Sequence, residues 1–181
     1  MRQAVVQVAV GVILNSDNQV LISQRASNVH LANLWEFPGG KIESNETTEL
    51  ALKRELYEEL DIEVIESQPL SKVVYDYGDK KVQLHIYLVK NYRGIACGKE
   101  KQKIQWQNIN RLDANQFPAA NISIIKQLQL PKQIQITGGF KTLNELLYKS
   151  ETCIQKGIQL IQFRAHQLDD VTYCEYAQSL L

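Results

Sequence analysis

The chain has 181 residues, 44% of them hydrophobic and 22% charged, which is enough for one full hydrophobic core and a smaller appended unit. Lys+Arg and Asp+Glu are equal at 20 each, so the chain lacks the basic excess that binding to a nucleic-acid polymer usually requires. No apolar run approaches the roughly 20 residues of a membrane helix, and the N-terminal apolar stretch is interrupted at Gln7 and has no cleavage site, which argues against a signal peptide.

The first region, residues 1–130, is predicted to be a domain of strands and helices. A turn at 15–18 should join its first two strands into a hairpin, and a second turn at 77–80 should join a later pair. Thr47 is a candidate N-cap for a helix whose apolar seam is Leu52, Leu56 and Leu60. Strands are expected at 4–14, 19–24, 70–76, 82–90 and 104–107, and a short helix at 121–128.

The pattern changes after Leu130-Pro131. Residues 131–181 are predicted to form a strand (133–137), a helix (142–155), a second strand (158–163) and a second helix (169–181). Two successive βα units indicate a parallel sheet. Two units cannot bury both faces of such a sheet, so we expect this region to be a fragment of something longer.

Three carboxylates share one side of the first predicted helix. Glu55, Glu58 and Glu59 are spaced three and four residues apart, where like charges repel by about 0.2–0.5 kcal/mol per pair. Acid-rich helices are common on surfaces, and a solvated face is the bland alternative. Hard oxygen ligands gathered in this way also suit Mg²⁺, with Mn²⁺ as an alternative, and a phosphorylated ligand would complete its shell.

The residues around this cluster favour a metal site over a solvated helix face. Gly40 is followed after five residues by Glu46, which is followed after seven by Arg54. The Gly39-Gly40 pair allows the backbone to approach an ion or phosphates closely. Glu46 and Arg54 are predicted to form an ion pair that fixes the loop against the helix.

This spacing resembles the Nudix box, GX5EX7REUXEEXGU. Every fixed position matches except the last glycine, where Asp61 stands; Asp tolerates the left-handed conformation expected at a helix end. The resemblance implies an α/β/α sandwich with a mixed sheet over residues 1–130, and attack of water on a phosphorus of a diphosphate. It implies these catalytic or metal-binding residues: Gly39 through its carbonyl, Arg54, Glu55, Glu58, Glu59 and Glu100. Which glutamate is the general base stays open, because carboxylates that share one ion titrate together.

Segments outside the box resemble the MutT-like subfamily, whose members hydrolyse 8-oxo-dGTP. These include Trp35-Glu36-Phe37-Pro38-Gly39-Gly40, Gly98-Lys99-Glu100 and Phe117-Pro118-Ala119-Ala120-Asn121. The resemblance implies that an amide at Asn121 reads the edge of the oxidised purine, for which its paired donor and acceptor are suited. It implies this substrate site: Arg25, His30, Glu36, Phe37, Pro38, Gly39 and Asn121.

Each of these residues also has an ordinary structural interpretation. Arg25 is equally a charge at the end of a strand, and His30 a loop residue. For Phe37 a place in the core is favoured over a role as a platform for a base. Asn121 is equally a helix N-cap.

Residues 131–181 resemble the first two βα units of thiamine phosphate synthase and its TenI-like relatives, and thus part of a TIM-type barrel. Gln162 and Arg164 match a phosphate-binding segment of that family, whereas His166 replaces its lysine. They are equally polar residues at a strand end. A complete barrel needs roughly 200 residues or more, so no synthase site is expected here.

The sequence therefore predicts a Mg²⁺-dependent hydrolase that converts nucleoside triphosphates, 8-oxo-dGTP above all, to monophosphate and pyrophosphate. The alternatives are hydrolysis of another diphosphate, such as a thiamine-related pyrophosphate, and a non-catalytic nucleotide sensor. Cys97, Cys153 and Cys174 favour reduced thiols in a cytoplasmic protein over a disulfide framework or a zinc site. We expect a nucleotide as the partner, no nucleic-acid polymer, no membrane, and a homodimer through residues 131–181.

Overall fold

The strand predicted at 4–14 lies at the centre of a four-stranded sheet in the computed structural model, which describes residues 5–27, 29 and 31–181. This strand, β1 (Val5–Ile13), pairs antiparallel with β4 (Gly39–Lys41) and parallel with β6 (Lys81–Arg93). The outer strand β5 (Glu63–Asp76) pairs antiparallel with β6. The sheet is therefore mixed, as predicted.

The second strand, β2 (Gln19–Gln24), belongs to a different sheet, between β3 (Trp35–Glu36) and β7 (Ile104–Asn108). The predicted hairpin between the first two strands is therefore wrong beyond its tip, where an isolated bridge joins Leu14 to Val20. The turn does reverse the chain, but both edges of β1 are already paired with β4 and β6. β2 therefore pairs with β3 and β7 instead.

Helix α1 (Thr48–Leu60) begins and ends as its sequence predicts. The side-chain oxygen of Thr47 accepts a hydrogen bond from the Leu50 amide and caps the N-terminus. The apolar seam of the helix is fully buried. At its C-terminus, Asp61 adopts the left-handed conformation with φ of 57°.

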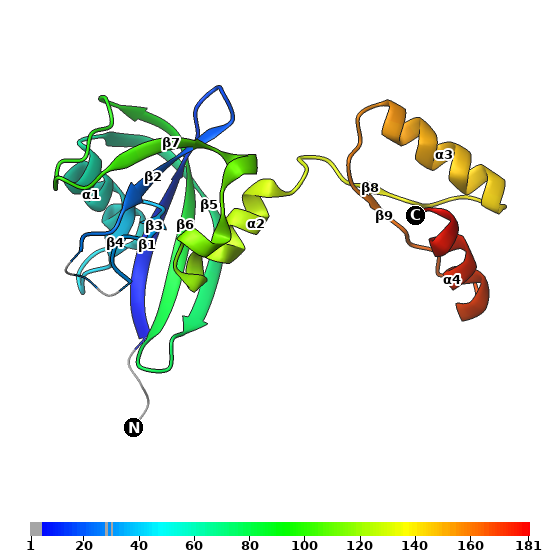
Figure 1. The fold of residues 1–181 in the computed structure, drawn as a ribbon, viewed down its shortest axis with the longest axis horizontal. Coiled ribbons are helices and arrows are strands. Elements are labelled where there is room, and N and C mark those ends of the chain that lie inside the picture. Colours follow the sequence, from blue (N-terminus) through cyan, green and yellow to red (C-terminus); the bar gives the residue numbers. More distant parts are fainter. Residues whose placement is uncertain (1–4, 28, 30) are drawn as a thin grey trace. The chain divides into compact units, whose positions relative to one another are not determined.

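Helices α1 and α2 (Ile122–Gln129) cover opposite sides of the sheets (Figure 1). Ala9 and Ile13 of β1 pack with α1, whereas Val10 and Val12 pack with α2, because side chains alternate along a strand. A Cβ at Gly11 would lie 2.9 Å from a methyl carbon of Leu56, so a larger residue would require the Leu56 side chain to move. The predicted α/β/α sandwich is confirmed.

The two longest strands exceed their predicted lengths. β5 starts at Glu63 rather than near residue 70, and β6 continues to Arg93. The first half of β5 contains polar residues and Pro69, so its sequence does not show the pattern of a strand. The pairing of β5 with β6 shifts register at Glu66 and Pro69. The turn between these strands lies at 77–80 as predicted, where the Tyr77 amide donates to the Lys80 carbonyl.

The chain divides into two compact units, Met1–Gln129 and Leu130–Leu181. In the smaller unit the predicted βαβα order is confirmed, with shorter strands that pair in parallel and a small core around Phe140, Leu146 and Ala165. The predicted identity of this unit as a fragment of a TIM-type barrel is not confirmed; the sheet within residues 130–181 has two strands. Its elements are β8 (Gln135–Ile136), α3 (Leu143–Gln155), β9 (Ile161–Gln162) and α4 (Asp170–Ser179). Across both units, the described residues include no helix of sufficient length and apolarity to cross a membrane.

Candidate active site

Arg54 is the centre of an ion-pair network at the side of α1. Its Nη2 lies 2.6 Å from Glu46 Oε1, and its Nη1 lies 2.9 Å from Glu55 Oε1 and 3.0 Å from Glu58 Oε2. Nη2 also donates to the carbonyl oxygen of Lys41 at 3.0 Å. The predicted pairing of Glu46 with Arg54 is confirmed. It fastens the loop before α1 to the helix and orients two of the predicted site carboxylates.

The two glycines of β4 are required by neighbours within the protein. A Cβ at Gly39, whose φ is 139°, would lie 2.1 Å from the carbonyl oxygen of Ala9 in β1. A Cβ at Gly40 would lie 2.2 Å from the carboxyl carbon of Glu55. The glycine pair thus lets β4 pair closely with β1 and leaves room for the Glu55 carboxylate, a different reason from the close approach to phosphates expected from sequence.

Glu59 carries a carboxyl group with a strongly raised pKa. Burial is the largest cause that raises the pKa of Glu59 to about 8, and the carboxylates of Glu36, Glu55 and Glu100 contribute to this rise. The Gly39 amide opposes this effect, since it donates to Glu59 Oε2 at 3.0 Å. Negative charge is therefore concentrated where water stabilises it poorly.

The donor chemistry of this cluster fits a divalent cation. Carboxylate oxygens of Glu55, Glu59 and Glu100 are hard ligands, and their mutual repulsion would be relieved by a positive ion. Glu58, by contrast, is half-exposed and bound to Arg54. Within the described ranges, no three His, Cys, Asp or Glu side chains gather closely enough to hold a metal ion as they stand.

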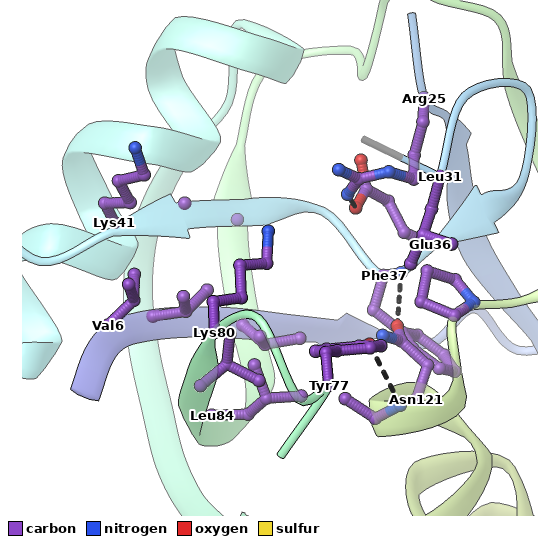
Figure 2. Close-up of a pocket in the computed structure, with 17 residues that line it drawn as sticks. Val6, Arg25, Leu31, Glu36, Phe37, Lys41, Tyr77, Lys80, Leu84 and Asn121 are labelled. Atoms are coloured by element: carbon purple, nitrogen blue, oxygen red, sulfur yellow. Dashed lines mark hydrogen bonds and ion pairs between the residues drawn. The ribbon is translucent and has the colours of Figure 1, made fainter. Parts of the chain in front are cut away.

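A cavity of about 220 Å³ lies beside this cluster, between the N-terminal half of β1 and the segment before α2 (Figure 2). Phe37 and Asn121 form part of its wall, and the Phe37 amide donates to Asn121 Oδ1 at 3.4 Å. Residues far apart in sequence therefore meet here. The predicted substrate residues that line the cavity are Arg25, Glu36, Phe37, Gly39 and Asn121.

The structure decides between the alternatives for Phe37 and Asn121. Phe37 is 3% exposed and packs against the ring of Phe117 at 5.7 Å, so the core interpretation is confirmed, although the residue also lines the cavity. Asn121 precedes α2, but its side chain binds the Phe37 amide rather than an amide of the helix. The N-cap interpretation of Asn121 is wrong, because its side-chain oxygen accepts from the Phe37 amide, in the segment before β4, instead of from an amide of α2.

An ion pair between Arg25 and Glu36 forms a wall shared by two cavities. Arg25 Nη1 contacts Glu36 Oε2, and burial raises the pKa of Glu36 although Arg25 opposes the shift. Both residues line the 220 Å³ cavity and a second one of about 580 Å³. Arg25 does follow the end of β2, but it is more than an isolated strand-end charge. The second cavity is also lined by Glu59 and Glu100.

Tyr77 and Lys80 are two further residues of this site that the sequence did not indicate. Both line the 220 Å³ cavity from the turn between β5 and β6, and the labelled side chains can be followed in Figure 2. Tyr77 Oη accepts a hydrogen bond from the Ala120 amide at 3.3 Å, which ties the turn to the segment that carries Asn121. The turn itself was predictable from the sequence. The proximity of this turn to residue 121 was not predictable, because that proximity depends on the pairing of three strands.

Two predicted substrate residues remain, Pro38 and His30. Pro38 lines neither cavity, and its carbonyl oxygen accepts from the Gly11 amide at 2.8 Å, which joins β1 to the loop before β4. His30 lies outside the described residues. Their assignment to the substrate site stays a prediction.

Comparisons with known proteins place this geometry in context. Residues 9–127 match the family described as NUDIX domain. The chain is 42% identical over 123 residues to an 8-oxo-dGTP diphosphatase of Escherichia coli (strain K12), which covers 68% of this chain and 95% of that relative. It is 33% identical over 115 residues to a CTP pyrophosphohydrolase of the same organism, across 64% of this chain and 84% of the relative. A solved MutT structure, described for Aliivibrio salmonicida and Vibrio cholerae, superposes with a TM-score of 0.60 at 35% identity and covers 69% of this chain and 97% of its own.

Proposed function

Because this chain belongs to the NUDIX family and is a pyrophosphohydrolase, we propose that it hydrolyses 8-oxo-dGTP to 8-oxo-dGMP and pyrophosphate with the help of a divalent cation. The similarity to 8-oxo-dGTP diphosphatases covers most of the larger unit and supports an oxidised purine nucleotide as the substrate. The similarity to enzymes favours catalysis over the non-catalytic nucleotide-sensing Nudix module considered from sequence.

The observation that carries the proposal is the wall shared by the two cavities. Arg25 and Glu36 line both, so one ligand is able to extend from the smaller, more apolar cavity into the larger, more polar one. We place the base beside Phe37 and Asn121, and the phosphates towards Glu59 and Glu100. A nucleoside triphosphate has this combination of an aromatic end and an anionic end.

At the base end, Asn121 is the residue we assign to recognition. An 8-oxo-purine carries a hydrogen on N7, where an ordinary purine has an acceptor, so an amide oxygen distinguishes the two. Asn121 Oδ1 already accepts from the Phe37 amide, which fixes its direction, and a carbonyl oxygen has a second lone pair for the base. Arg25, Glu36, Phe37, Gly39, and also His30 and Pro38, complete the proposed substrate site.

At the phosphate end, the chain's own residues hold the carboxylates in place. Arg54 orients Glu55 and Glu58, and the Gly39 amide holds Glu59. We propose that one of the glutamates, Glu100 included, accepts a proton from the water that attacks phosphorus, while the bond to the bridging oxygen breaks and pyrophosphate leaves. The expected cofactor, Mg²⁺ or alternatively Mn²⁺, would be held by Glu55, Glu58, Glu59, Glu100 and the Gly39 carbonyl, and supplies charge neutralisation on the phosphoryl oxygens.

The test is a substrate panel with the purified chain and Mg²⁺. We expect kcat/KM for 8-oxo-dGTP to exceed that for dGTP by roughly tenfold or more, as one buried hydrogen bond of about 1–3 kcal/mol provides. Chromatography should show pyrophosphate rather than orthophosphate. CTP belongs in the panel because of the CTP pyrophosphohydrolase relative, and thiamine pyrophosphate because of the resemblance in residues 131–181. Preference for either would overturn the proposed substrate.

The remaining proposals concern the rest of the chain. Parallel pairing of β8 with β9, with Gln162 at the end of β9, supports a part of a β/α barrel for the smaller unit, to which we assign no activity. We also propose that two copies of the chain associate through this smaller unit. A cytoplasmic location is consistent with a nucleotide substrate and with three free cysteines.

A further inference from the structure

The carbonyl groups at the end of α1 are bound by the segment that carries Glu100. The Cys97 amide donates to the Leu60 carbonyl at 3.0 Å, and the Lys99 amide donates to the Glu59 carbonyl at 3.0 Å. The last carbonyls of a helix have no partner inside the helix. The segment therefore docks on the very end of the helix that contributes Glu59 to the candidate active site.

One side chain, Gln102, connects the two glutamates directly. Its Nε2 donates to the backbone carbonyl of Glu59 at 2.8 Å, and its Oε1 accepts from the backbone amide of Glu100 at 3.0 Å. Both the nitrogen and the oxygen of the Gln102 side-chain amide therefore form hydrogen bonds with these two residues. The distance between the backbone of Glu59 and that of Glu100 is therefore set by this side chain together with the hydrogen bond from the Lys99 amide.

The turn that presents Gln102 is tightly built. A Cβ at Gly98 would lie 2.0 Å from the carbonyl oxygen of Gln102, so a side chain has no room there. Lys101 adopts a left-handed conformation with φ of 66°, and its amide donates to the Gly98 carbonyl at 3.0 Å. Glu100 itself is exposed, so the frame around it, rather than its own burial, fixes its position.

We propose that Gln102 is a positioning residue that holds the carboxylate of Glu100 in register with that of Glu59. Both glutamates line the 580 Å³ cavity, as does Gln102 itself. This inference rests on the proposed function, in which Glu100 acts on the metal or on the attacking water. Losing the bridge displaces Glu100 but leaves the base cavity unchanged, because Gln102 does not line that cavity.

The experiment compares Gln102→Met, which keeps the length of the side chain and removes both hydrogen bonds, with the wild-type chain. We expect kcat for 8-oxo-dGTP to fall by roughly ten- to a hundredfold with KM nearly unchanged, the effect of misplacing a catalytic group by about 1 Å. Amide hydrogen exchange at Glu100 should accelerate by roughly fivefold or more, since its hydrogen-bond acceptor is lost. Mn²⁺ affinity, measured by calorimetry on the metal-free protein, should weaken if Glu100 is a ligand and stay constant if Glu100 is the base.

Two further variants show whether the effect is specific. Gln102→Glu retains the acceptor for the Glu100 amide and should restore slow exchange at that amide. Gln105→Met is the matched control: Gln105 is exposed on β7 and donates to Gln107 Oε1 at 2.9 Å, so its loss should change neither kcat nor exchange at Glu100. Thermal melting of each variant establishes that it is folded.

A double-mutant cycle with Glu100→Gln separates this inference from the proposed function. If Gln102 acts through Glu100, adding Gln102→Met to Glu100→Gln should lower kcat by less than about twofold further. Additive losses, or unchanged exchange at Glu100 in Gln102→Met, overturn the positioning role alone. A fully active Glu100→Gln variant removes Glu100 from the proposed function as well, and the inference fails together with that assignment.

Discussion

Lys99 reaches back to the end of α1, where its Nζ lies 2.8 Å from Oδ1 of Asp61 and 4.2 Å from the ring centre of Tyr57. Asp61 occupies the position at which the Nudix box has glycine. Its carboxylate therefore binds the segment that precedes Glu100, a contact that glycine cannot make. The departure from the motif adds a second attachment of this segment, besides the backbone hydrogen bonds.

The first prediction concerns this position. Asp61→Gly should change the free energy of unfolding by less than about 1 kcal/mol, because a half-exposed ion pair contributes little and glycine relieves the left-handed backbone. Asp61→Val should destabilise the protein by about 1–2 kcal/mol, since a β-branched residue is poorly tolerated at φ of 57°. Urea denaturation of the two variants measures the difference. Equal stability of both would show that the left-handed conformation is not retained.

The second prediction concerns the carboxylates on α1. Glu55→Gln and Glu59→Gln should each lower kcat about a hundredfold or more, the order expected when a metal ligand or a general base is lost. Both variants should stay folded, because neutral amides remove the repulsion within the cluster. Glu49→Gln, in the first turn of the same helix and paired with Lys53 at 3.5 Å, is the control and should keep full activity. Activity of the first two variants within about threefold of wild type would contradict the assigned site.

The third prediction concerns base recognition. Asn121→Ala should reduce the preference for 8-oxo-dGTP over dGTP and leave kcat for dGTP almost unchanged. Removing one hydrogen bond to the base costs about 1–3 kcal/mol, or roughly five- to a hundredfold in the ratio of kcat/KM values. Because the Phe37 amide also loses its acceptor, the melting temperature of the variant must be measured beside its kinetics. Unchanged selectivity would leave Asn121 with a structural role only.

The fourth prediction concerns pH and metal. Glu59 has an ordinary pKa of 4.5 when exposed and about 8 in the folded protein, so the folded state binds the proton more tightly than the unfolded state. The contribution of this group to stability is therefore fully present below pH 4.5 and is lost as the pH rises towards 8. Thermal melts in a chelator should show this decline, and Glu59→Gln should flatten it. Mg²⁺ added at the upper pH should recover stability in the wild type, and an unchanged melt would argue against a cation at this cluster.

The fifth prediction concerns the smaller unit. Ile134 and Ile136 are 52% and 45% exposed, and β8 and β9 leave open sheet edges on which another chain can pair. Deleting residues 132–181 should leave hydrolysis intact and reduce any dimer seen by light scattering. If the deletion abolishes catalysis while the larger unit stays folded, the smaller unit belongs to the active site.

Local patterns in the sequence were sufficient for the elements near the site. A nearly continuous apolar run predicts β1, and the helical spacing of Leu52, Leu56 and Leu60 predicts α1. Thr47 predicts where α1 begins. All of these signals depend on neighbours a few residues away. The spacing from Gly40 to Glu59 likewise identified the family through a local motif. The short βαβα order of the smaller unit was predictable for the same reason.

Strand partnership was decided only by the tertiary structure. Nothing in the turn at 15–18 indicates that β2 belongs to a second sheet, since this depends on β4 and β6 occupying both edges of β1. The same long-range pairing brings Tyr77 to the segment of Asn121 and gives the Arg25–Glu36 pair its place between two cavities. The sequence by itself determined which carboxylates and which amide are present. Their common site is a property of the folded chain, because hydrogen bonds between distant strands, rather than local preferences, set the distances between them.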